Sequence, residues 1–393
     1  MLNKRLSIGN ILNSYLKNPV VLDVETTTSN DGNPFDLKNK LVLIQLKNKE
    51  KSIYFTKEDF HLCLSHLEKA SLLVGQNIKF DLHWMRRELG YIPKVPIWEL
   101  QNAEFLFSNQ QWKYPDLDTM CKNYGVGEKI HTIEEKYWSK GIDTDEIPVL
   151  ELAEYGIHDV ELTWKVFQEQ IKRFQNDINN KFPLFRLLCN DLLVLQEMEW
   201  NGIIYDEINS LVKSKDIEYS ILILEDKINE LVESDVLNYN SGDDISILLY
   251  GGTKVKKIRF PIGFYKTGVK TGQPRYKIIK ETIEFPRRVT PLKGSELSKE
   301  GFYATNILTL LSLKTTGKTK KIIDLLLERS ALEKINGTYL KGFPKTREKY
   351  NWPVNKLHSS LNQCVASTGR LSSTKPNQQN LADLAKSFCI TRY

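Results

Sequence analysis

Residues 19–28, PVVLDVETTT, begin like a buried strand and then carry two carboxylates. The apolar run at 20–22 is followed by Asp23 and Glu25, with one valine between them. Side chains two residues apart on a strand share a face, so both carboxylates point the same way. Such a pair is unfavourable unless cations hold it, and hard divalent ions bind carboxylate oxygens. The pair therefore indicates either a metal site or a solvated loop entrance at the end of a core strand.

The composition is that of a globular protein with more than one domain. The chain has 393 residues, and domains usually contain about 100–200. Its hydrophobic fraction is 41%, its charged fraction 26% and its net charge +6, a mild basic excess. The five cysteines include no CxxC pair, which argues against a disulfide framework or a cysteine zinc site. Without a signal-like or membrane-length apolar run, we expect a soluble, cytoplasmic chain, in the host cytoplasm if it is phage-encoded.

Residues 19–176 alternate between strand-like and helix-like patterns, which is typical of an α/β domain with a mixed sheet. The expected strands are VVLDVE, KLVLIQL, KSIYF and SLLVGQN, with the second and third in a meander. The expected helices are DFHLCLSHLEKA, KFDLHWMRREL and a long amphipathic helix over 148–174. Residues 1–18 are then an N-terminal extension.

A polar stretch, FQNDINNKFP, predicts a domain boundary near 176–183, because its proline marks a break. Residues 184–233 and 295–340 have helical, leucine-rich patterns, with a glycine interruption in WNGIIYD. We therefore expect a second, mostly helical domain at 184–345.

A basic segment at 253–294 interrupts this helical domain. It holds 12 Lys or Arg against 2 Glu. Alternation in KVKKIRF and RYKIIKETIEF, joined by a loop with Gly and Pro, predicts a β-ribbon with a basic face. The ribbon is either a solvated surface or a contact surface for a phosphate backbone, and the clustering with Tyr and Phe favours the second.

Three further side chains accompany the first two acids. Asp81, in VGQNIKFD, starts a helix after another expected core strand, where open α/β sheets commonly build sites. Tyr155 and Asp159, in EYGIHD, are four residues apart and share a helix face. His158 lies about 100° round that helix from Asp159 and is interpreted as a packing or surface residue. Four acids in this order predict a single acidic site.

The segments LDVETT, GQNIKFD and YGIHD resemble the three sequence motifs of the DnaQ-like (DEDD) 3′–5′ exonucleases, in the tyrosine-bearing subclass with an RNase H-like fold. The resemblance implies the catalytic residues Asp23, Glu25, Asp81, Tyr155 and Asp159, of which the four acids bind two Mg²⁺ ions, or Mn²⁺. In that family one metal activates a water and the other stabilises the leaving 3′ oxygen. The tyrosine hydroxyl orients the water, and Asn77 matches a position that helps hold the strand being cut.

A second resemblance covers the C-terminal half. LQEMEWNGIIYD and LLLERSALEKINGTYLKGF resemble the start and the closing helix of the thumb in family A (polymerase I-like) DNA polymerases. HSSLNQCVASTGRLSSTKPNQQNL is similar to that family's entry to the palm, which places the start of a palm at 346–393. The basic segment at 253–294 is better described as an elaboration of the thumb.

This second resemblance implies a set of DNA-binding residues along a primer–template duplex. The set is Thr338, Arg370, Asn377, Gln379 and Asn380. An arginine can reach minor-groove acceptors, which are nearly the same for every base pair, and so test shape without reading sequence. The other reading of the palm-like segment is a polar loop with structural hydrogen bonds.

The chain ends at AKSFCITRY. In family A the first catalytic aspartate of the palm, the nucleotide-binding lysine of the fingers and the later palm carboxylates all come after this point. We therefore expect an incomplete palm and no DNA polymerisation by this chain alone. The closing TRY falls in a strand-like segment whose unpaired edge would be sticky.

The leading hypothesis is a two-metal 3′–5′ exonuclease that proofreads DNA in replication and releases nucleoside monophosphates. Its expected partner is DNA, as a single-stranded 3′ end at the exonuclease site and a duplex at the thumb, with no membrane. One alternative is a DNA-clamping subunit of a split polymerase, completed by a separate palm and fingers chain. Another is a standalone DEDD nuclease acting on RNA, against which the thumb-like and palm-like segments argue.

Overall fold

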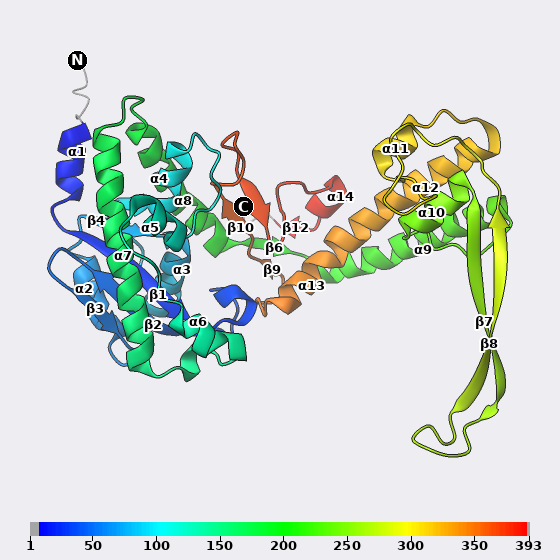
Figure 1. The fold of residues 1–393 in the computed structure, drawn as a ribbon, viewed down its shortest axis with the longest axis horizontal. Coiled ribbons are helices and arrows are strands. Elements are labelled where there is room, and N and C mark those ends of the chain that lie inside the picture. The colour runs from blue at the N-terminus through cyan, green and yellow to red at the C-terminus, as the bar shows by residue number, and fades with distance from the viewer. Residues whose placement is uncertain (1–7, 391–393) are drawn as a thin grey trace. The chain divides into compact units, whose positions relative to one another are not determined.

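The computed structural model describes residues 8–390, and the chain divides into two compact units. The first unit is Met1–Glu207 with Phe343–Tyr393, and the second is Ile208–Gly342. Each unit is described by itself below (Figure 1). Part of the expected N-terminal extension (1–7) and the closing TRY (391–393) lie outside the described residues.

The first unit is built on a five-stranded mixed sheet in the order β3-β2-β1-β4-β5. The strands are β1 (Pro19–Thr26), β2 (Leu41–Lys47), β3 (Ser52–Phe55), β4 (Leu72–Gly75) and β5 (Ile97–Glu99). β1 pairs antiparallel with β2 and parallel with β4, while β2 and β3 form the expected meander. The α/β class and the mixed sheet predicted from the sequence are confirmed.

Apolar side chains fill both faces of this sheet, because neighbouring residues on a strand point to opposite sides. On one face Val21, Val74 and Trp98 pack with residues of the helices α7 (Val149–Gln175) and α8 (Phe182–Asn201). On the other face Val20 and Leu22 belong to a second core together with residues of α3 (Ile78–Leu89). Asp23 and Glu25 continue the alternation of Val21, so they face α7.

Besides α3, α7 and α8, five short α-helices lie within residues 8–148 of this unit. They are α1 (Ile8–Tyr15), α2 (Leu64–Leu67), α4 (Leu100–Phe107), α5 (Leu117–Tyr124) and α6 (Thr132–Lys136). The segment DFHLCLSHLEKA, expected as one helix, is instead a 3-10 turn at Phe60–Cys63 followed by the single turn α2. α1 is not a free extension, because its Leu12 and Tyr15 are buried in the core that also contains Val21.

The long helix α7 lies against β1 and β2 and approaches the sheet closely at Gly156 (Figure 1). A Cβ added at Gly156 would lie 2.0 Å from Nε2 of Gln45, a fully buried side chain of β2. Gln45 is the register partner of Asp23 and therefore shares its face of the sheet. The absence of a side chain at Gly156 thus lets α7 descend onto the part of the sheet that carries Asp23.

The predicted domain boundary at 176–183 does not divide the two compact units. α8 follows it, and its Phe182, Phe185 and Cys189 are buried in the sheet core. The ring of Phe185 lies 4.7 Å from that of Trp98, edge to face. Burial of these aromatic side chains keeps α8 in the first unit, which therefore continues to Glu207.

The segment from Phe343 onward belongs to the first unit as well, and Glu199 of α8 shows how it is held. The buried Glu199 carboxylate accepts a hydrogen bond from Lys79 Nζ at 2.6 Å and from the Leu361 amide at 2.5 Å. Its other oxygen lies 2.7 Å from His83 Nε2. The carboxylate thus joins α8, α3 and the palm-like segment.

The palm-like segment contains α13 (Gly342–Lys349), α14 (Asp383–Lys386) and several short strands. β6 (Ile203–Tyr205) pairs with both β9 (Lys356–Leu357) and β12 (Cys389–Ile390). β10 (Ser360–Asn362) and β11 (Ser372–Thr374) form a separate antiparallel pair.

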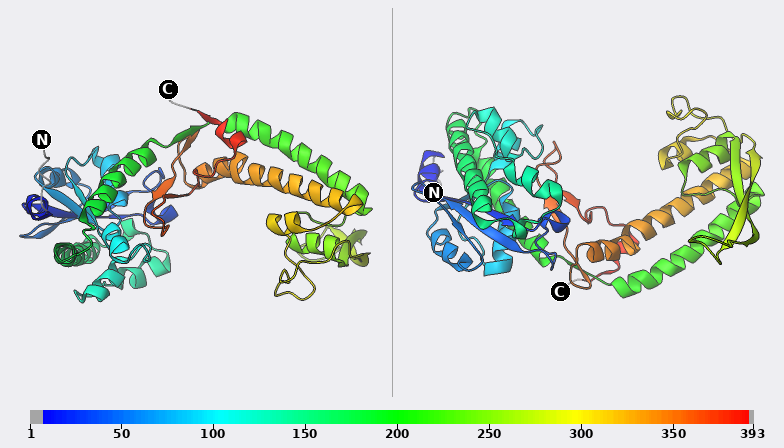
Figure 2. Two further views of the ribbon diagram at one scale, coloured as in Figure 1. Left: turned by 90° about the horizontal axis from the view of Figure 1, so that it is seen from above. Right: turned by 60° about the horizontal axis from the view of Figure 1, so that its bottom comes forward.

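The second unit is mostly helical, as the sequence predicts. It contains α9 (Glu207–Val232), α10 (Gly242–Tyr250), α11 (Ile307–Ser312), α12 (Gly317–Ile335) and a π-helix at Asn336–Leu340. α9 and α12 run side by side in both views of Figure 2. The buried Arg329 of α12 donates to Glu225 of α9 at 2.6 Å and to the Tyr239 carbonyl at 3.2 Å. Charge-assisted hydrogen bonds of this kind fix the pairing of the two helices.

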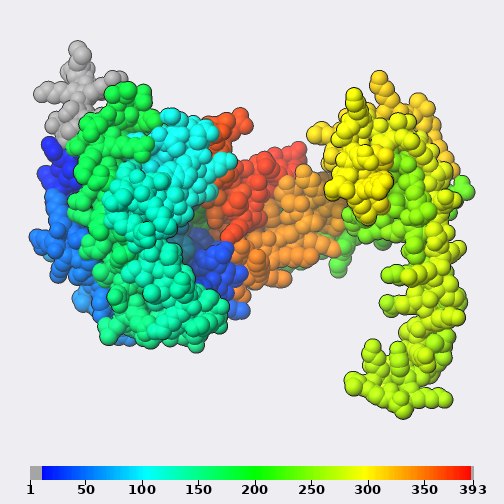
Figure 3. Space-filling model, in the orientation of Figure 1, coloured from blue at the N-terminus to red at the C-terminus, as the bar shows by residue number. Residues whose placement is uncertain are grey.

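The predicted β-ribbon is present and is the most exposed part of the second unit (Figure 3). β7 (Gly252–Phe264) and β8 (Pro274–Phe285) pair antiparallel along most of their length. The helical pattern expected from residue 295 begins only with α11 at Ile307, after a loop with a single bridge between Glu296 and Tyr303. Within residues 8–390, no helix is both long and apolar enough to cross a lipid bilayer.

The close approach at Gly156 gives a stability prediction. Gly156→Ala forces a methyl group against Gln45 and should lower the free energy of unfolding by about 1–3 kcal/mol. Urea denaturation measures the change, with Glu154→Ala on the exposed side of α7 as control. Because the two residues are in contact, adding Gln45→Ala should recover part of the loss. Equal stability of Gly156→Ala and Glu154→Ala would contradict the close approach.

Candidate active site

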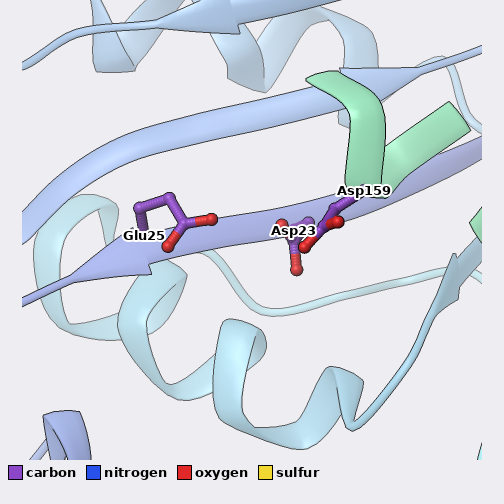
Figure 4. Close-up of side chains that lie close together, drawn as sticks. All are labelled: Asp23, Glu25 and Asp159. Atoms are coloured by element: carbon purple, nitrogen blue, oxygen red, sulfur yellow. The ribbon is translucent and has the colours of Figure 1, made fainter. Parts of the chain in front are cut away.

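Three carboxylates meet where the C-terminal half of β1 passes under α7 (Figure 4). One oxygen each of Asp23, Glu25 and Asp159 lies within 4.8 Å of the others. Asp23 and Glu25 come from β1, and Asp159 comes from α7. The pairing of β1 with β2 shifts register between Glu25 and Thr26, and such bulges re-aim side chains at sites. The structure thus brings together three of the four predicted acids.

The electrostatics of this cluster are those of crowded, poorly hydrated acids. Burial, and then the Asp159 carboxylate, raise the pKa of Asp23 to about 7. Burial, and then Asp23 and Asp159, raise the pKa of Glu25 well above its ordinary value. Burial also raises the pKa of Asp159, although Lys129 opposes that shift. Full ionisation of the cluster therefore requires added positive charge.

The fourth predicted acid, Asp81, lies beside this cluster rather than among its three members. It sits in the first turn of α3, and its Oδ1 accepts the Val24 amide at 3.0 Å, between the two acids of β1. Burial, and then Asp23, raise the pKa of Asp81 well above its ordinary value. Asp81 is thus close enough to Asp23 for the two carboxylates to repel each other.

The predicted Tyr155 is buried next to Asp159 and is held by two partners. Lys129 Nζ donates to the Tyr155 hydroxyl at 2.7 Å and forms an ion pair with Asp159 Oδ2 at 2.9 Å. The hydroxyl in turn donates to Glu134 Oε1 at 3.1 Å. The Trp138 ring packs edge-on against the tyrosine at 5.9 Å. These contacts fix the hydroxyl at the rim of the acidic cluster.

Lys129 supplies the positive charge nearest to the cluster. Burial lowers its pKa, but attraction to Asp159, Asp23 and Glu25 outweighs burial, so the net shift is upward. The ammonium group is therefore charged and offsets part of the carboxylate repulsion. Its effect on Asp23 is the smallest of the three causes that shift that group.

The cluster fits a divalent cation on the chemistry of its donors. Asp159 Oδ1 is buried and has no hydrogen-bond partner among residues 8–390. A buried, partnerless carboxylate oxygen is costly, and a hard cation that prefers oxygen ligands would satisfy it. Lys129 occupies the other oxygen of the same group.

The start of α3 is fixed by a buried carboxylate from β5. Glu99 accepts the amides of Asn77 at 2.9 Å and Ile78 at 2.7 Å. Asn77, predicted to touch the substrate strand, has a left-handed backbone (φ 59°) and an exposed side chain. It borders a pocket of about 460 Å³ that Tyr114 and Asn362 also line. Glu99 thus sets the position of both Asn77 and, one turn later, Asp81.

The other predicted DNA-binding residues are exposed and lie in both units. Arg370 is in the loop between β10 and β11, and Asn377 and Gln379 follow β11. The Asn377 side chain accepts the Gln379 amide at 3.0 Å, which gives that loop a defined turn. Asn380 follows directly, while Thr338 is in the π-helix of the second unit.

Sequence reasoning missed Lys129, Glu134 and Glu99. Lys129 and Glu134 come from the segment GEKIHTIEEK, which has no strand or helix periodicity strong enough to orient its charges. A mixed run of this kind is ordinarily read as solvated surface. A signal for Glu99 does exist: it is an acid at the end of a strand-like run, as Asp23 is. His158 is half-buried and meets the Glu128 carbonyl at 2.9 Å, as expected for a packing or surface residue.

Comparison with known proteins adds to this geometry. Residues 8–173 match the family described as 3′–5′ exonuclease, and residues 283–388 match DNA polymerase family A. DNA polymerase I of Bacillus subtilis is 26% identical over 294 residues, which are 72% of this chain and 27% of that protein. The DNA polymerase of Bacillus phage SP01 is 24% identical over 355 residues, 80% of this chain and 34% of that protein. The chain therefore spans about a third or less of these relatives.

A solved structure has the same fold. It is the POL domain of Pol1 from M. smegmatis in complex with DNA primer-template and dNTP, with a TM-score of 0.64 and 14% identity. The alignment covers 96% of this chain and 55% of that one. The fold and the acidic cluster define a 3′–5′ exonuclease domain joined to a polymerase-like region. The N-terminal part of the chain is thus similar to 3′–5′ exonucleases, and its C-terminal part to DNA polymerase family A.

The raised pKa of Asp23 predicts how stability depends on pH without metal. Because its pKa is about 7 when folded and 3.8 ordinarily, folding favours the protonated form. The contribution of Asp23 to stability is therefore largest below about pH 4 and is lost as the pH rises through 7. Asp23→Asn removes this loss, so in EDTA its Tm should exceed that of wild type by more at pH 8 than at pH 5. A gap that does not widen would contradict the shift.

Lys129 gives a second prediction. Lys129→Met leaves Asp159 and its neighbours without their nearest counter-charge and should lower stability in EDTA at pH 8 by about 3 kcal/mol. Lys129→Arg keeps the charge and should lose less. Mg²⁺ should stabilise Lys129→Met more than wild type, because the ion replaces the missing charge. Differential scanning fluorimetry with and without Mg²⁺ tests this, and an unchanged Tm in EDTA would contradict it.

Proposed function

We propose that this chain hydrolyses DNA from 3′ ends, releases nucleoside monophosphates and proofreads newly made strands in replication. The observation that supports this most directly is the meeting of Asp23, Glu25 and Asp159 within 4.8 Å in an exonuclease-family domain. Tyr155, held at their rim, completes the set expected for the tyrosine-bearing subclass.

Divalent ions are the cofactor that this site fits. Asp23, Glu25, Asp81 and Asp159 would hold two Mg²⁺ ions, with Mn²⁺ able to replace them. When bound, the ions supply a water made nucleophilic at neutral pH and charge stabilisation at the scissile phosphate and the leaving 3′ oxygen. Asp159 Oδ1, which has no hydrogen-bond partner in the described part of the chain, is the atom that a cation would most clearly satisfy.

The chain's own side chains then bind and orient the reacting groups. The Tyr155 hydroxyl, placed by Lys129 and Glu134, accepts or donates a hydrogen bond to the attacking water and limits its direction of approach. Its pKa is raised above the ordinary value, first by burial and then by Asp159, so the phenol stays protonated and acts as a positioning group. Lys129 is near enough to the cluster to stabilise negative charge on the phosphate.

Selection of mismatched ends follows from access to the site. Asn77 is exposed at the start of α3 and would hydrogen-bond the terminal nucleotides of a single strand. A mismatched 3′ end unpairs at lower cost than a matched one, so a site that requires an unpaired strand acts on it preferentially.

The residues of the polymerase-like segments would bind the duplex next to the 3′ end. Arg370 is exposed and makes no ion pair within residues 8–390. It would reach minor-groove acceptors, while Asn377, Gln379, Asn380 and Thr338 would contact sugar, phosphate or base edges. These contacts position a primer–template without reading its sequence.

The first test is shortening of a 5′-labelled single-stranded DNA oligonucleotide with Mg²⁺. Wild type should give a ladder that shortens from the 3′ end and stops in EDTA. Asp23→Ala should lower the rate about 10³-fold or more, since it removes several kcal/mol of charge stabilisation. Tyr155→Phe should lower it about 10- to 100-fold, as expected for loss of an orienting hydroxyl.

The matched control is Glu50→Ala, which removes an exposed carboxylate far from the cluster in sequence and should leave the rate unchanged. If wild type binds DNA but does not shorten it, the proposal fails. The chain would then be better described as a DNA-clamping subunit completed by a separate palm and fingers chain. Shortening of RNA alone would also contradict the proposal.

A further inference from the structure

The ribbon Gly252–Phe285 carries a charge pattern that the exonuclease proposal does not use. Apart from its last three residues it lies outside both family matches. It contains nine Lys or Arg and two Glu. Apart from its base, nearly all its side chains are exposed.

The pairing register separates the ribbon into two faces, because residues directly opposite in an antiparallel pair point the same way. One face contains Lys254 and Lys256, which form ion pairs with Asp244 at 2.5 Å and Asp235 at 2.9 Å. It ends in the buried Phe285, part of the core of the second unit. This face therefore attaches the ribbon to its own helices.

The opposite face, here called the basic face, contains Lys257, Arg259 and Lys280, together with Glu284 near the base of the ribbon. Lys257 and Lys280 are directly opposite each other, and Arg259 follows two residues along β7. All three are exposed, and none forms an ion pair among the described residues 8–390. Like charges directly opposite on two strands repel each other, and an external anion would offset that repulsion.

The connecting loop and the start of β8 add three cations to the same arm. Lys266, Lys270 and Arg275 are exposed, and none forms an ion pair within the described part of the chain. The thirteen residues of β7 span about 40 Å, since a strand rises about 3.3 Å per residue. A ribbon that protrudes this far buries little apolar surface of its own and is marginal alone (Figure 3).

We propose that the basic face binds the phosphate backbone of duplex DNA without regard to sequence. Duplex DNA presents one negative charge per about 1.7 Å of its axis, so a straight row of cations meets many phosphates. A two-stranded ribbon also has the width that a groove of B-DNA admits. The binding would hold the duplex at the ribbon while the nuclease site works on the 3′ end.

The pattern favours duplex DNA over two other occupants. Proteins that bind single strands stack successive bases on several aromatic rings, whereas the basic face has one, Tyr276. A protein partner would be expected to bury an apolar centre with few charges. Here Val255 and Ile278 are exposed apolar side chains, but the pair Lys257 and Lys280 lies between them along the strands, and Arg259 is directly opposite Ile278.

The test is equilibrium binding of the full chain to a labelled 30-base-pair duplex of arbitrary sequence. Binding is measured by fluorescence anisotropy, in EDTA so that no cleavage occurs. The test variant is Lys257→Gln with Arg259→Gln and Lys280→Gln. Loss of three phosphate contacts should raise Kd by about tenfold or more near 100 mM salt. The slope of log affinity against log salt should become shallower by about 3.

The matched control is Lys51→Gln with Lys57→Gln and Lys69→Gln. These exposed lysines of the first unit form no ion pair among the described residues, and their loss changes net charge by the same amount. The control should keep the wild-type Kd and slope. The charge-conserving variant Lys257→Arg with Arg259→Lys and Lys280→Arg should bind as wild type does, and circular dichroism checks that each variant folds.

Three results would overturn the inference. They are a basic-face variant with wild-type Kd and salt slope, an equal loss in the control, and a greater loss for single-stranded than for duplex DNA. The inference is separable from the proposed nuclease activity, because the basic-face variant should still shorten a short single-stranded oligonucleotide with Mg²⁺. Failure of that assay in wild type bears on the nuclease proposal and leaves the duplex-binding result intact.

Discussion

Repulsion between buried carboxylates is the constraint on which the first unit depends. Two unit charges about 5 Å apart repel by about 3 kcal/mol even when the effective dielectric constant is about 20. Asp23, Glu25 and Asp159 are held at this range, with Asp81 beside them. No fold would keep them together for stability alone, so the surrounding structure has to force the approach and supply compensating charge.

The compensation comes in part from the chain itself. Lys129 pairs with one oxygen of Asp159 and leaves the other without a partner among the described residues. Protons supply more, since the pKa of Asp23 rises to about 7. Protonation and cation binding compete for the same oxygens. As the pH rises through about 7, Asp23 loses its proton and cation binding becomes more favourable. Tyr155 is coupled to these charges, because the Lys129 ammonium group that pairs with Asp159 also donates a hydrogen bond to the Tyr155 hydroxyl.

The approach itself is enforced by packing. Gly156, one residue after Tyr155, removes the side chain that would meet Gln45 and so brings α7 down onto the sheet. On the sheet side of that contact, Gln45 of β2 is paired in register with Asp23 of β1. The position of Asp159 relative to Asp23 is therefore set by a helix–sheet distance, and that distance by the absence of one methyl group.

The placement of the site residues in two pairs was predictable because it is local, and the resemblance of the three segments to the exonuclease motifs joined the pairs with Asp81 in one site. Spacing of two on a strand places Asp23 and Glu25 on one face, and spacing of four on a helix does the same for Tyr155 and Asp159. Lys129 was not predictable, because it comes from an irregular segment whose path depends on tertiary packing. The boundary at 176–183 does not coincide with the division into compact units for a related reason: a polar break marks a turn, but only packing decides whether the next helix returns to the same core.

The acidic cluster and the basic face tolerate change differently, because they depend on different physical quantities. The acidic cluster works through distances between a few oxygens, so its chemistry is sensitive to a single carbon at Gly156 or a single charge at Lys129. The basic face works through the number of cations along a strand, since phosphate contacts position a duplex without specifying it. Lysine and arginine are then nearly interchangeable on the ribbon.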